Sequence, residues 1–259
     1  MTIPISTKEY LIDNINNILS VAIQNRLIIP FYQPIINNET NEIVKYEALM
    51  RIDYNDKILY PKDFLDYSLK NNFYMELSRL MLEKIFYDVS EYNINVSINL
   101  TMEDISDDIT TSLIYSLLKT SKYPKNITFE IVEIFHIFNT EKFNIFSNEI
   151  KKYGSMLSID DFGTGYSNFE YFSKFEFDFI KIDGLFIKDI LDNEKHEKIV
   201  KSLSSLVEGT DIKLIAEYVE NETIFEKIKT LKIHYSQGFL FGEAIPIEKV
   251  ISRTCYINI

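Results

Sequence analysis

The sequence predicts an α/β fold in which helices cover one parallel β-sheet or barrel. Short apolar runs alternate with segments of helical periodicity along nearly the whole chain, and this alternation is the pattern of parallel α/β folds. No Pro-, Gly- or Ser-rich linker divides the chain. The chain has 259 residues, 46% of them hydrophobic, and α/β barrels reach this length as one unit. We therefore expect a single barrel domain.

The first element is predicted to be a helix. Ser6-Thr7-Lys8-Glu9 has the spacing of a capping box, and apolar residues follow at helical spacing from Leu11 to Ile23. Strands are then predicted, in chain order, over residues 27–35, 43–51, 94–99, 127–130, 156–159, 177–181, 212–217 and 233–237. Helices are predicted between them: after Pro61, along the stripe that contains Leu77 and Ile85, after Thr101, after Thr140, around Leu203 and over 224–231.

Composition and charge exclude several classes of protein. The formal net charge of −12 argues against a protein that binds the backbone of a nucleic-acid polymer. Cys255 is the only cysteine, so no intrachain disulfide can form and a reducing compartment fits. The N-terminus has no basic segment followed by an apolar one, and the apolar stretch 27–36 is interrupted and too short to span a membrane. We expect a cytoplasmic protein that does not contact the membrane.

Polar side chains follow the apolar part of seven predicted strands. In a β/α barrel the carboxyl ends of the strands gather at one face, where catalysis takes place. Five carboxylates, two amides and one lysine would meet there: Glu47, Asn99, Glu130, Asp160, Asp161, Lys181, Glu217 and Gln237. Any one of them could instead cap a helix or lie in solvent. The whole set cannot easily do so, because lysine and glutamine are poor caps and buried carboxylates without partners are costly.

The pair Asp160-Asp161 is the centre of this predicted site. Adjacent carboxylates repel each other and are stable beside a cation, and Gly163 and Gly165 allow a tight turn or a close approach to a ligand. Oxygen ligands without cysteine or histidine favour Mg²⁺ or Mn²⁺ over zinc. Five carboxylates are too many for one such ion. Two ions roughly 3.5–4 Å apart would use them all, and such a pair suits hydrolysis of a phosphate ester, with Lys181 holding the attacking water or the developing negative charge.

A resemblance to a known family follows from these residues. Glu47-Ala48-Leu49, within Tyr46-Glu47-Ala48-Leu49-Met50-Arg51, resembles the signature of the EAL domains, which are cyclic di-GMP phosphodiesterases. Further motifs of the family occur in order: Gln33-Pro34-Ile35, Asn99-Leu100, Glu130-Ile131-Val132-Glu133, Asp160-Asp161-Phe162-Gly163-Thr164-Gly165, Lys181-Ile182-Asp183, Ala216-Glu217 and Gln237-Gly238-Phe239. The resemblance implies a single (β/α)8 barrel of the TIM type whose first strand is antiparallel to the others. We expect this barrel over residues 25–259 and an N-terminal helix within 1–24.

The resemblance also implies a role for individual residues. Six residues match metal ligands: Glu47, Asn99, Glu130, Asp160, Asp161 and Glu217. The residues expected to act in catalysis are Glu47, Lys181, Glu217 and Gln237, and those expected to bind substrate are Gln33, Leu49, Arg51 and Asp183. Glu133 matches a glutamate that steadies the loop after Asp160-Asp161. The implied cofactors are two Mg²⁺ or Mn²⁺ ions, and Ca²⁺ is expected to bind without supporting turnover.

The resemblance leaves alternatives open. The family usually has glycine where this chain has Tyr218, and a basic residue and proline where it has Glu243-Ala244; both departures concern affinity at the rim of the site. Some relatives that have lost catalysis act as cyclic di-GMP sensors or protein-interaction modules, but they usually lack one of the acids, and here all are present. A sugar hydrolase with two carboxylates leaves the lysine and the Asp-Asp pair unexplained. The expected partners are cyclic di-GMP as substrate, a second copy in a homodimer, and a regulatory protein, since no sensor segment is recognised.

Overall fold

The computed structural model describes residues 8–132, 140–163 and 172–257, with side chains for 14–132, 140–163 and 172–252. In this part of the chain, eight strands form a closed barrel. They are β1 (Ile28–Asn37), β2 (Ile43–Tyr54), β4 (Val96–Leu100), β5 (Ile127–Ile131), β6 (Met156–Phe162), β7 (Phe179–Ile182), β8 (Lys213–Ala216) and β9 (Tyr235–Gln237). Each strand pairs with the next, and β1 pairs with both β2 and β9, which closes the sheet. The predicted barrel is confirmed.

Strand β1 runs opposite to its neighbours. It is antiparallel to β2 and to β9, whereas the pairs from β2–β4 to β8–β9 are parallel. The antiparallel first strand implied by the family resemblance is therefore confirmed. Because the other seven barrel strands are parallel to one another, they run toward the same end of the barrel, where the site is expected.

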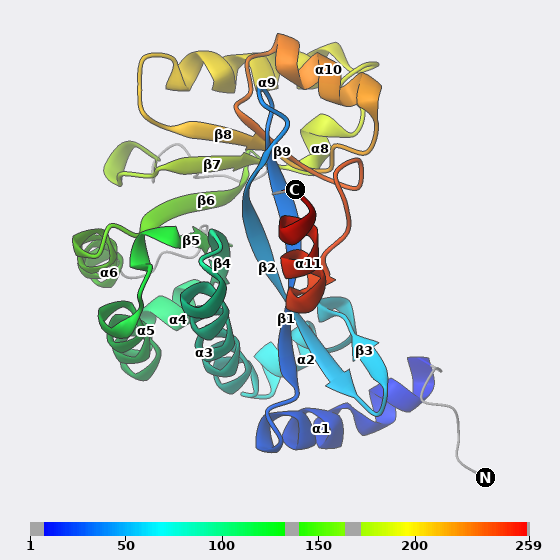
Figure 1. Ribbon diagram of the computed structural model, residues 1–259, viewed down its shortest axis with the longest axis vertical. Coiled ribbons are helices and arrows are strands. Elements are labelled where there is room, and N and C mark those ends of the chain that lie inside the picture. Colours follow the sequence, from blue (N-terminus) through cyan, green and yellow to red (C-terminus); the bar gives the residue numbers. More distant parts are fainter. Residues whose placement is uncertain (1–7, 133–139, 164–171, 258–259) are drawn as a thin grey trace.

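Helices lie around the outside of the barrel (Figure 1). In chain order they are α1 (Lys8–Gln24), α2 (Pro61–Lys70), α3 (Tyr74–Tyr92), α4 (Met102–Ser106), α5 (Asp108–Thr120), α6 (Thr140–Lys152), α8 (Gly184–Ile187), α9 (Glu194–Val207), α10 (Glu222–Thr230) and α11 (Ile247–Ile257), with a 3-10 turn at Pro124–Asn126. None of them, within the described residues, is long and apolar enough to cross a membrane. The N-terminal helix is confirmed from Lys8 onward; Ser6 and Thr7 of the capping box lie outside the described residues.

Strands β1 and β2 continue beyond the barrel and carry a small lobe. Their pairing extends to Ile28 opposite Ile52, and β2 then pairs with β3 (Lys57–Leu59). Helices α1 and α2 pack together at this end (Figure 1). Glu47 therefore lies within β2, as the predicted strand over residues 43–51 implies, and the observed strand extends three residues further, to Tyr54.

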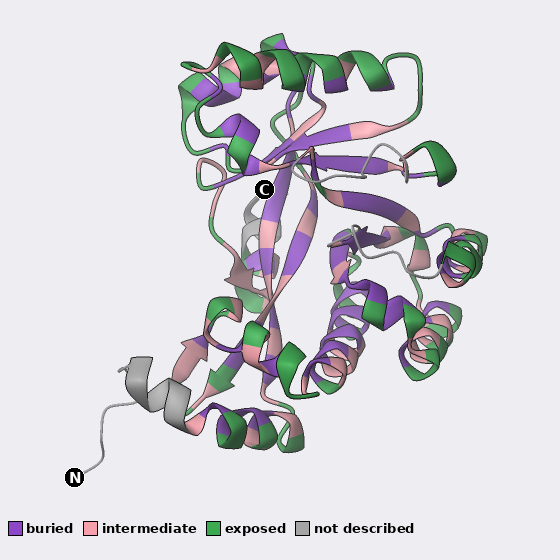
Figure 2. Ribbon diagram, turned by 180° about the vertical axis from the view of Figure 1, so that it is seen from behind, coloured by how far each residue is buried: buried purple, intermediate pink, exposed green. Residues whose placement is uncertain are grey.

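The barrel interior below the predicted site contains a small apolar cluster beside buried polar side chains. Ile35, Phe179 and Ile215 form a small buried cluster of their own, separate from the main core between the barrel and its helices. Figure 2 shows the strands as largely buried, with exposure concentrated on the outer faces of the helices and in loops. Two further elements at the chain's end, β10 (Ile245–Pro246) and α11, were not predicted; they pack against β1.

Candidate metal centre and active site

Lys181 lies at the centre of the predicted site. Its side chain is 1% exposed, and its ammonium is 2.8 Å from Glu217 Oε1, 3.1 Å from Asp160 Oδ1 and 3.5 Å from Glu47 Oε2. It also donates a hydrogen bond to Glu130. Strand β7 thus places one cation among carboxylates from β2, β5 and β6 and from the loop after β8, as the pattern of strand ends predicted.

Glu47 is held by two amides. Asn99 Nδ2 donates to Glu47 Oε1 at 2.8 Å, and Gln237 Nε2 donates to Glu47 Oε2 at 2.6 Å. Gln237 Nε2 also lies 3.1 Å from Gln33 Oε1, and Gln33 in turn donates to the carbonyl of Gly242. These contacts link β2, β4, β9 and β1 across the barrel mouth. The predicted residues Glu47, Asn99 and Gln237 therefore form one hydrogen-bonded group.

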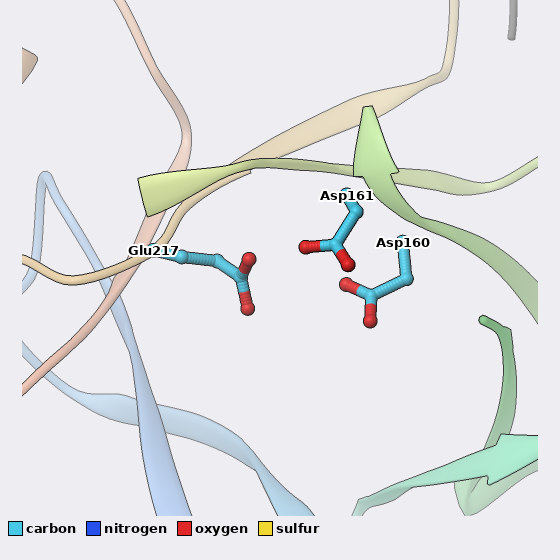
Figure 3. A group of neighbouring side chains, drawn as sticks. All are labelled: Asp160, Asp161 and Glu217. Carbon is cyan, nitrogen blue, oxygen red and sulfur yellow. The ribbon is translucent and has the colours of Figure 1, made fainter. Parts of the chain in front are cut away.

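The Asp160-Asp161 pair reaches the same space because the backbone turns between them. Asp161 has a φ of 49°, in the left-handed region that non-glycine residues seldom adopt. Gly163 has a φ of 107°, and a Cβ there would lie 2.7 Å from the Phe186 ring. Both residues of the pair thus point toward Glu217 (Figure 3). Asp160, Asp161 and Glu217 each offer one carboxylate oxygen, and these three oxygens lie within 4.8 Å of one another.

The centre contains many acidic side chains and few positive charges, and this composition shifts the pKa values of its carboxylates. Burial raises the pKa of Glu217 to about 8 and the pKa of Asp161 to about 7, and the charge of Asp160 adds to both. Burial also raises the pKa of Glu130 well above its usual range, despite the nearby Lys181. For Glu47, burial is outweighed by Lys181 and the two amides, which together lower its pKa. Carboxylates with raised pKa values of this kind become ionised beside a cation.

The donor set fits divalent metal ions. All predicted ligands offer oxygen atoms, the type that Mg²⁺ and Mn²⁺ prefer. Three buried acceptor oxygens of the centre, Asn99 Oδ1, Glu130 Oε2 and Gln237 Oε1, find no hydrogen-bond donor among the described residues. Buried acceptors without donors are costly, and cations at the mouth would satisfy such oxygens.

Two cavities adjoin the centre. One, of about 260 Å³, opens at the mouth and is lined by Gln33, Glu47, Leu49, Glu217, Tyr218, Glu220, Gln237, Gly238 and Phe239. The other, of about 560 Å³, is largely apolar and extends from Leu49, Asn99, Asp160 and Asp161 toward α2 and α3. Polar ligand residues at the meeting point of two partly apolar cavities suit an organic molecule with a charged middle and apolar ends.

Comparison with known proteins identifies the family. The model of the EAL domain matches residues 16–244. The chain belongs to the EAL domain family. A cyclic di-GMP phosphodiesterase, PdeA, of Borreliella burgdorferi is 34% identical over 233 residues, which cover 87% of this chain and 35% of that protein. The chain thus spans about a third of the length of the curated relatives it matches.

Solved EAL structures have the same fold. An EAL domain protein from Listeria monocytogenes EGD-e superimposes with a TM-score of 0.84 and 26% identity, covering 92% of this chain and 96% of that one. The EAL enzyme Bd1971, in its form with cAMP and cyclic di-GMP bound, gives a TM-score of 0.83 at 25% identity, covering 93% of this chain and 69% of that one.

The residues that give the EAL family its name lie on one strand, with Glu47 and Leu49 on the same face. Because side chains alternate along a strand, Arg51 lies on this same face of β2. Arg51 is buried and donates a hydrogen bond to the carbonyl of Met50 at 2.8 Å. Its guanidinium carbon lies 4.7 Å from the centre of the Tyr60 ring. Tyr60 was not singled out from the sequence, because a cation–π contact leaves no spacing signal.

Two predicted site residues, Asp183 and Glu133, remain to be located in the structure. Asp183 caps α8 by accepting from the amide of Leu185 at 2.6 Å, and it also shares a hydrogen bond with Asp161 that helps to raise the pKa of Asp161. It thus borders the centre, and its predicted contact with substrate stays a prediction. Glu133 lies outside the described residues.

Tyr218, where EAL domains usually have glycine, lines the mouth. It has a φ of 54°, a left-handed conformation that glycine adopts without strain. Its ring packs against Gly184, where a Cβ would lie 2.1 Å from Tyr218 Cδ2, and the ammonium of Lys188 lies 3.9 Å from the ring centroid. Tyr218 is thus one of the residues that line the cavity at the mouth.

Proposed function

We propose that this chain hydrolyses one phosphodiester bond of cyclic di-GMP and releases linear pGpG. The observation that carries the proposal is the group of five carboxylates around the buried Lys181 at the mouth of an EAL barrel. Relatives named cyclic di-GMP phosphodiesterases support the choice of substrate, as does an EAL enzyme solved with cyclic di-GMP bound.

The residues of the centre would act through charge and position. Glu47, Asn99, Glu130, Asp160, Asp161 and Glu217 would hold two divalent ions, Mg²⁺ or Mn²⁺. Such ions supply an activated water and stabilise the attacking and leaving oxygens of an in-line displacement. Lys181, a donor fixed by its carboxylate contacts, would hold the attacking water or stabilise negative charge on the phosphoryl oxygens.

The remaining groups would bind and orient the substrate. Gln237 and Gln33 present amides at the mouth, and Leu49 contributes to the walls of both cavities. Arg51, held by Tyr60 and the Met50 carbonyl, would pair with a substrate phosphate, which its planar fork suits. Asp183 would contact the substrate from the edge of α8. Glu133 would steady the loop after Asp160-Asp161.

The identity of the ion is tested by substituting Ca²⁺. Hard oxygen ligands accept Ca²⁺, but its ligand distances of about 2.3–2.6 Å exceed the 2.0–2.1 Å of Mg²⁺. In-line attack tolerates little displacement, so Ca²⁺ is expected to bind in calorimetry and to support no turnover. Turnover in Ca²⁺ equal to that in Mg²⁺ would show that the ions only position the substrate.

The assembly and location of the protein complete the proposal. We expect residues 25–259 to form the catalytic unit, with the N-terminal helix as an addition to it, in a cytoplasmic protein that forms a homodimer and responds to a regulatory partner. The sequence supports the dimer only weakly, through the aromatic residues Tyr166, Phe169, Tyr171 and Phe172 just after the Asp160-Asp161 loop; the first three lie outside the described residues, whereas Phe172 is described. A mass of one chain across micromolar concentrations in sedimentation would count against the dimer.

The direct test is a product assay. Purified protein is incubated with cyclic di-GMP and Mg²⁺ or Mn²⁺, and the products are separated by chromatography and identified by mass. The expected result is pGpG, which disappears when EDTA is added. Binding of cyclic di-GMP without any product would instead indicate a nucleotide-sensing module.

A further inference from the structure

Tyr218 is an exposed aromatic residue beside the metal centre. It directly follows Glu217, lines the 260 Å³ cavity at the mouth and is 49% exposed. Exposed apolar residues that occur singly are common on protein surfaces and need no special role. The position of Tyr218 and the support of its ring therefore decide what it does.

Helix α8 supports the ring from one side. A Cβ at Gly184 would lie 2.1 Å from Tyr218 Cδ2, so glycine lets the ring pack directly against the helix. Lys188, which follows α8 in helical conformation, has its ammonium 3.9 Å from the ring centroid, close enough for a cation–π contact. Because residues four apart lie on the same side of a helix, both contacts reach the ring from α8.

The backbone next to Tyr218 is fixed as well. The Val219 amide donates to the Gln237 carbonyl at 3.0 Å, and the Leu240 amide donates to the Val219 carbonyl at 3.2 Å. These hydrogen bonds join the loop after β8 to the end of β9, where the Gln237 side chain holds Glu47. The ring is thus held in place before any ligand arrives, and a preorganised contact loses little conformational entropy on binding.

We propose that Tyr218 is a specificity-determining residue whose ring stacks on an aromatic base of the substrate at the mouth. The proposal rests on the proposed function in taking a cyclic dinucleotide as the ligand. The base of a nucleotide lies one sugar away from its phosphate, so a ring on the residue after Glu217 is within reach of a base whose phosphate the centre holds. Every base has a flat π-face, and stacking on an aromatic side chain contributes substantially to nucleotide binding.

The alternative is that Tyr218 only narrows the entrance to the centre. The two explanations predict different changes in affinity. If the ring is an obstacle, a smaller side chain leaves the binding of cyclic di-GMP unchanged or makes it tighter. If the ring stacks on a base, an aliphatic replacement makes binding weaker, and phenylalanine, which keeps the ring, preserves it.

The first test is calorimetric titration of the wild type, Tyr218→Phe and Tyr218→Leu with cyclic di-GMP in Ca²⁺, with chromatography to verify that the nucleotide stays intact. If Ca²⁺ supports cleavage, the same comparison is made in the Glu47→Gln background. Leucine and phenylalanine, like tyrosine, carry a Cβ at the φ of 54°, so both variants keep the backbone strain of the wild type. We expect Tyr218→Leu to bind about tenfold or more weakly and Tyr218→Phe to bind within about twofold of the wild type.

The second test uses the absence of tryptophan from the chain. Tyr218→Trp places a single indole at the mouth, and a guanine stacked on an indole quenches its fluorescence. Tyr123→Trp is the matched control, because Tyr123 lies just before β5, at the end of the barrel opposite the mouth. We expect cyclic di-GMP to quench the emission of Tyr218→Trp and to leave that of Tyr123→Trp unchanged. This readout carries the test if the leucine variant does not fold.

Equal or tighter binding in Tyr218→Leu would overturn the proposal. Equal weakening in Tyr218→Phe and Tyr218→Leu would also overturn it, because the hydroxyl rather than the ring would then be responsible, as would unquenched emission of Tyr218→Trp with the nucleotide bound. A wild type that binds cyclic di-GMP without cleaving it would refute the proposed activity and leave these comparisons valid. A wild type that does not bind cyclic di-GMP would refute both.

Discussion

At the scale of single residues, Lys181 differs from the ordinary lysines of this chain. Burial alone would lower its pKa, but Asp160, Glu130, Glu217 and Glu47 hold that pKa well above the usual range. The ammonium therefore stays charged throughout the pH range in which an enzyme works. A charge fixed by several carboxylates is arranged in advance of the reaction, and such preorganised charge stabilises transition states effectively.

Lys181→Met is expected to lower the turnover rate at saturating substrate by about a hundredfold or more, because one preorganised donor is lost. Binding of Mn²⁺ is expected to persist. Steady-state kinetics and calorimetry measure the two effects separately. Lys151→Met is the matched control, since Lys151 pairs with Asp178 away from the centre, at 3.3 Å. A Lys181 variant that loses only affinity and keeps its rate would contradict the catalytic role.

Glu47→Gln is expected to abolish measurable turnover while the protein stays folded. The glutamine keeps the size of the side chain, so the amides of Asn99 and Gln237 keep a neighbour, but a charged ligand is lost. Turnover and circular dichroism are measured on the same sample, and Glu220→Gln, at the cavity rim, serves as the control. Normal activity together with normal metal binding would remove Glu47 from the centre.

At the scale of elements, the strand ends could be predicted from the sequence because parallel strands gather their carboxyl ends at one face. Apolar runs followed by acids therefore located Glu130, Asp160 and Glu217 correctly. The local backbone could not be predicted, because no pattern in the sequence indicates the left-handed φ of Asp161 or Tyr218. The prediction also missed the chain-terminal α11, although Ile247, Val250 and Ile251 lie at helical spacing, and it ended β2 three residues early.

Gly184→Ala tests how α8 and the loop after β8 fit together. A Cβ at 184 would lie 2.1 Å from Tyr218 Cδ2, so the ring must move, and the variant is expected to be less stable to urea by roughly 1–3 kcal/mol. Adding Tyr218→Gly is expected to recover most of that loss, because it removes the clash and suits the φ of 54°. A double-mutant cycle measures the coupling; additive effects would show that the two elements do not constrain each other.

At the scale of the whole molecule, the acidic mouth links stability to pH. In the metal-free protein the pKa values of Glu217 and Asp161 are raised to about 8 and about 7. Between the unfolded pKa values, near 4, and these folded values, the folded state holds protons that the unfolded state has lost. The free energy of unfolding therefore falls as pH rises through this window.

The thermal midpoint of EDTA-treated protein is accordingly expected to be lower at pH 8 than at pH 5.5. The double variant Glu217→Gln with Asp161→Asn is the control and is expected to flatten the dependence, because neither replaced group titrates. Saturating Mn²⁺ is also expected to flatten it, since the ions take the place of the protons. A midpoint of the wild type that rises with pH in EDTA would contradict these pKa shifts.

The central claim is that the carboxylates at the barrel mouth form a metal-dependent phosphodiesterase centre. The most direct measurement titrates EDTA-treated protein with Mn²⁺ and follows metal occupancy by calorimetry and conversion of cyclic di-GMP to pGpG by chromatography on the same preparation. The account predicts no product before metal is added, pGpG formation that rises with occupancy, and none at full occupancy in Glu47→Gln. Full occupancy of the wild-type centre without any pGpG would contradict it.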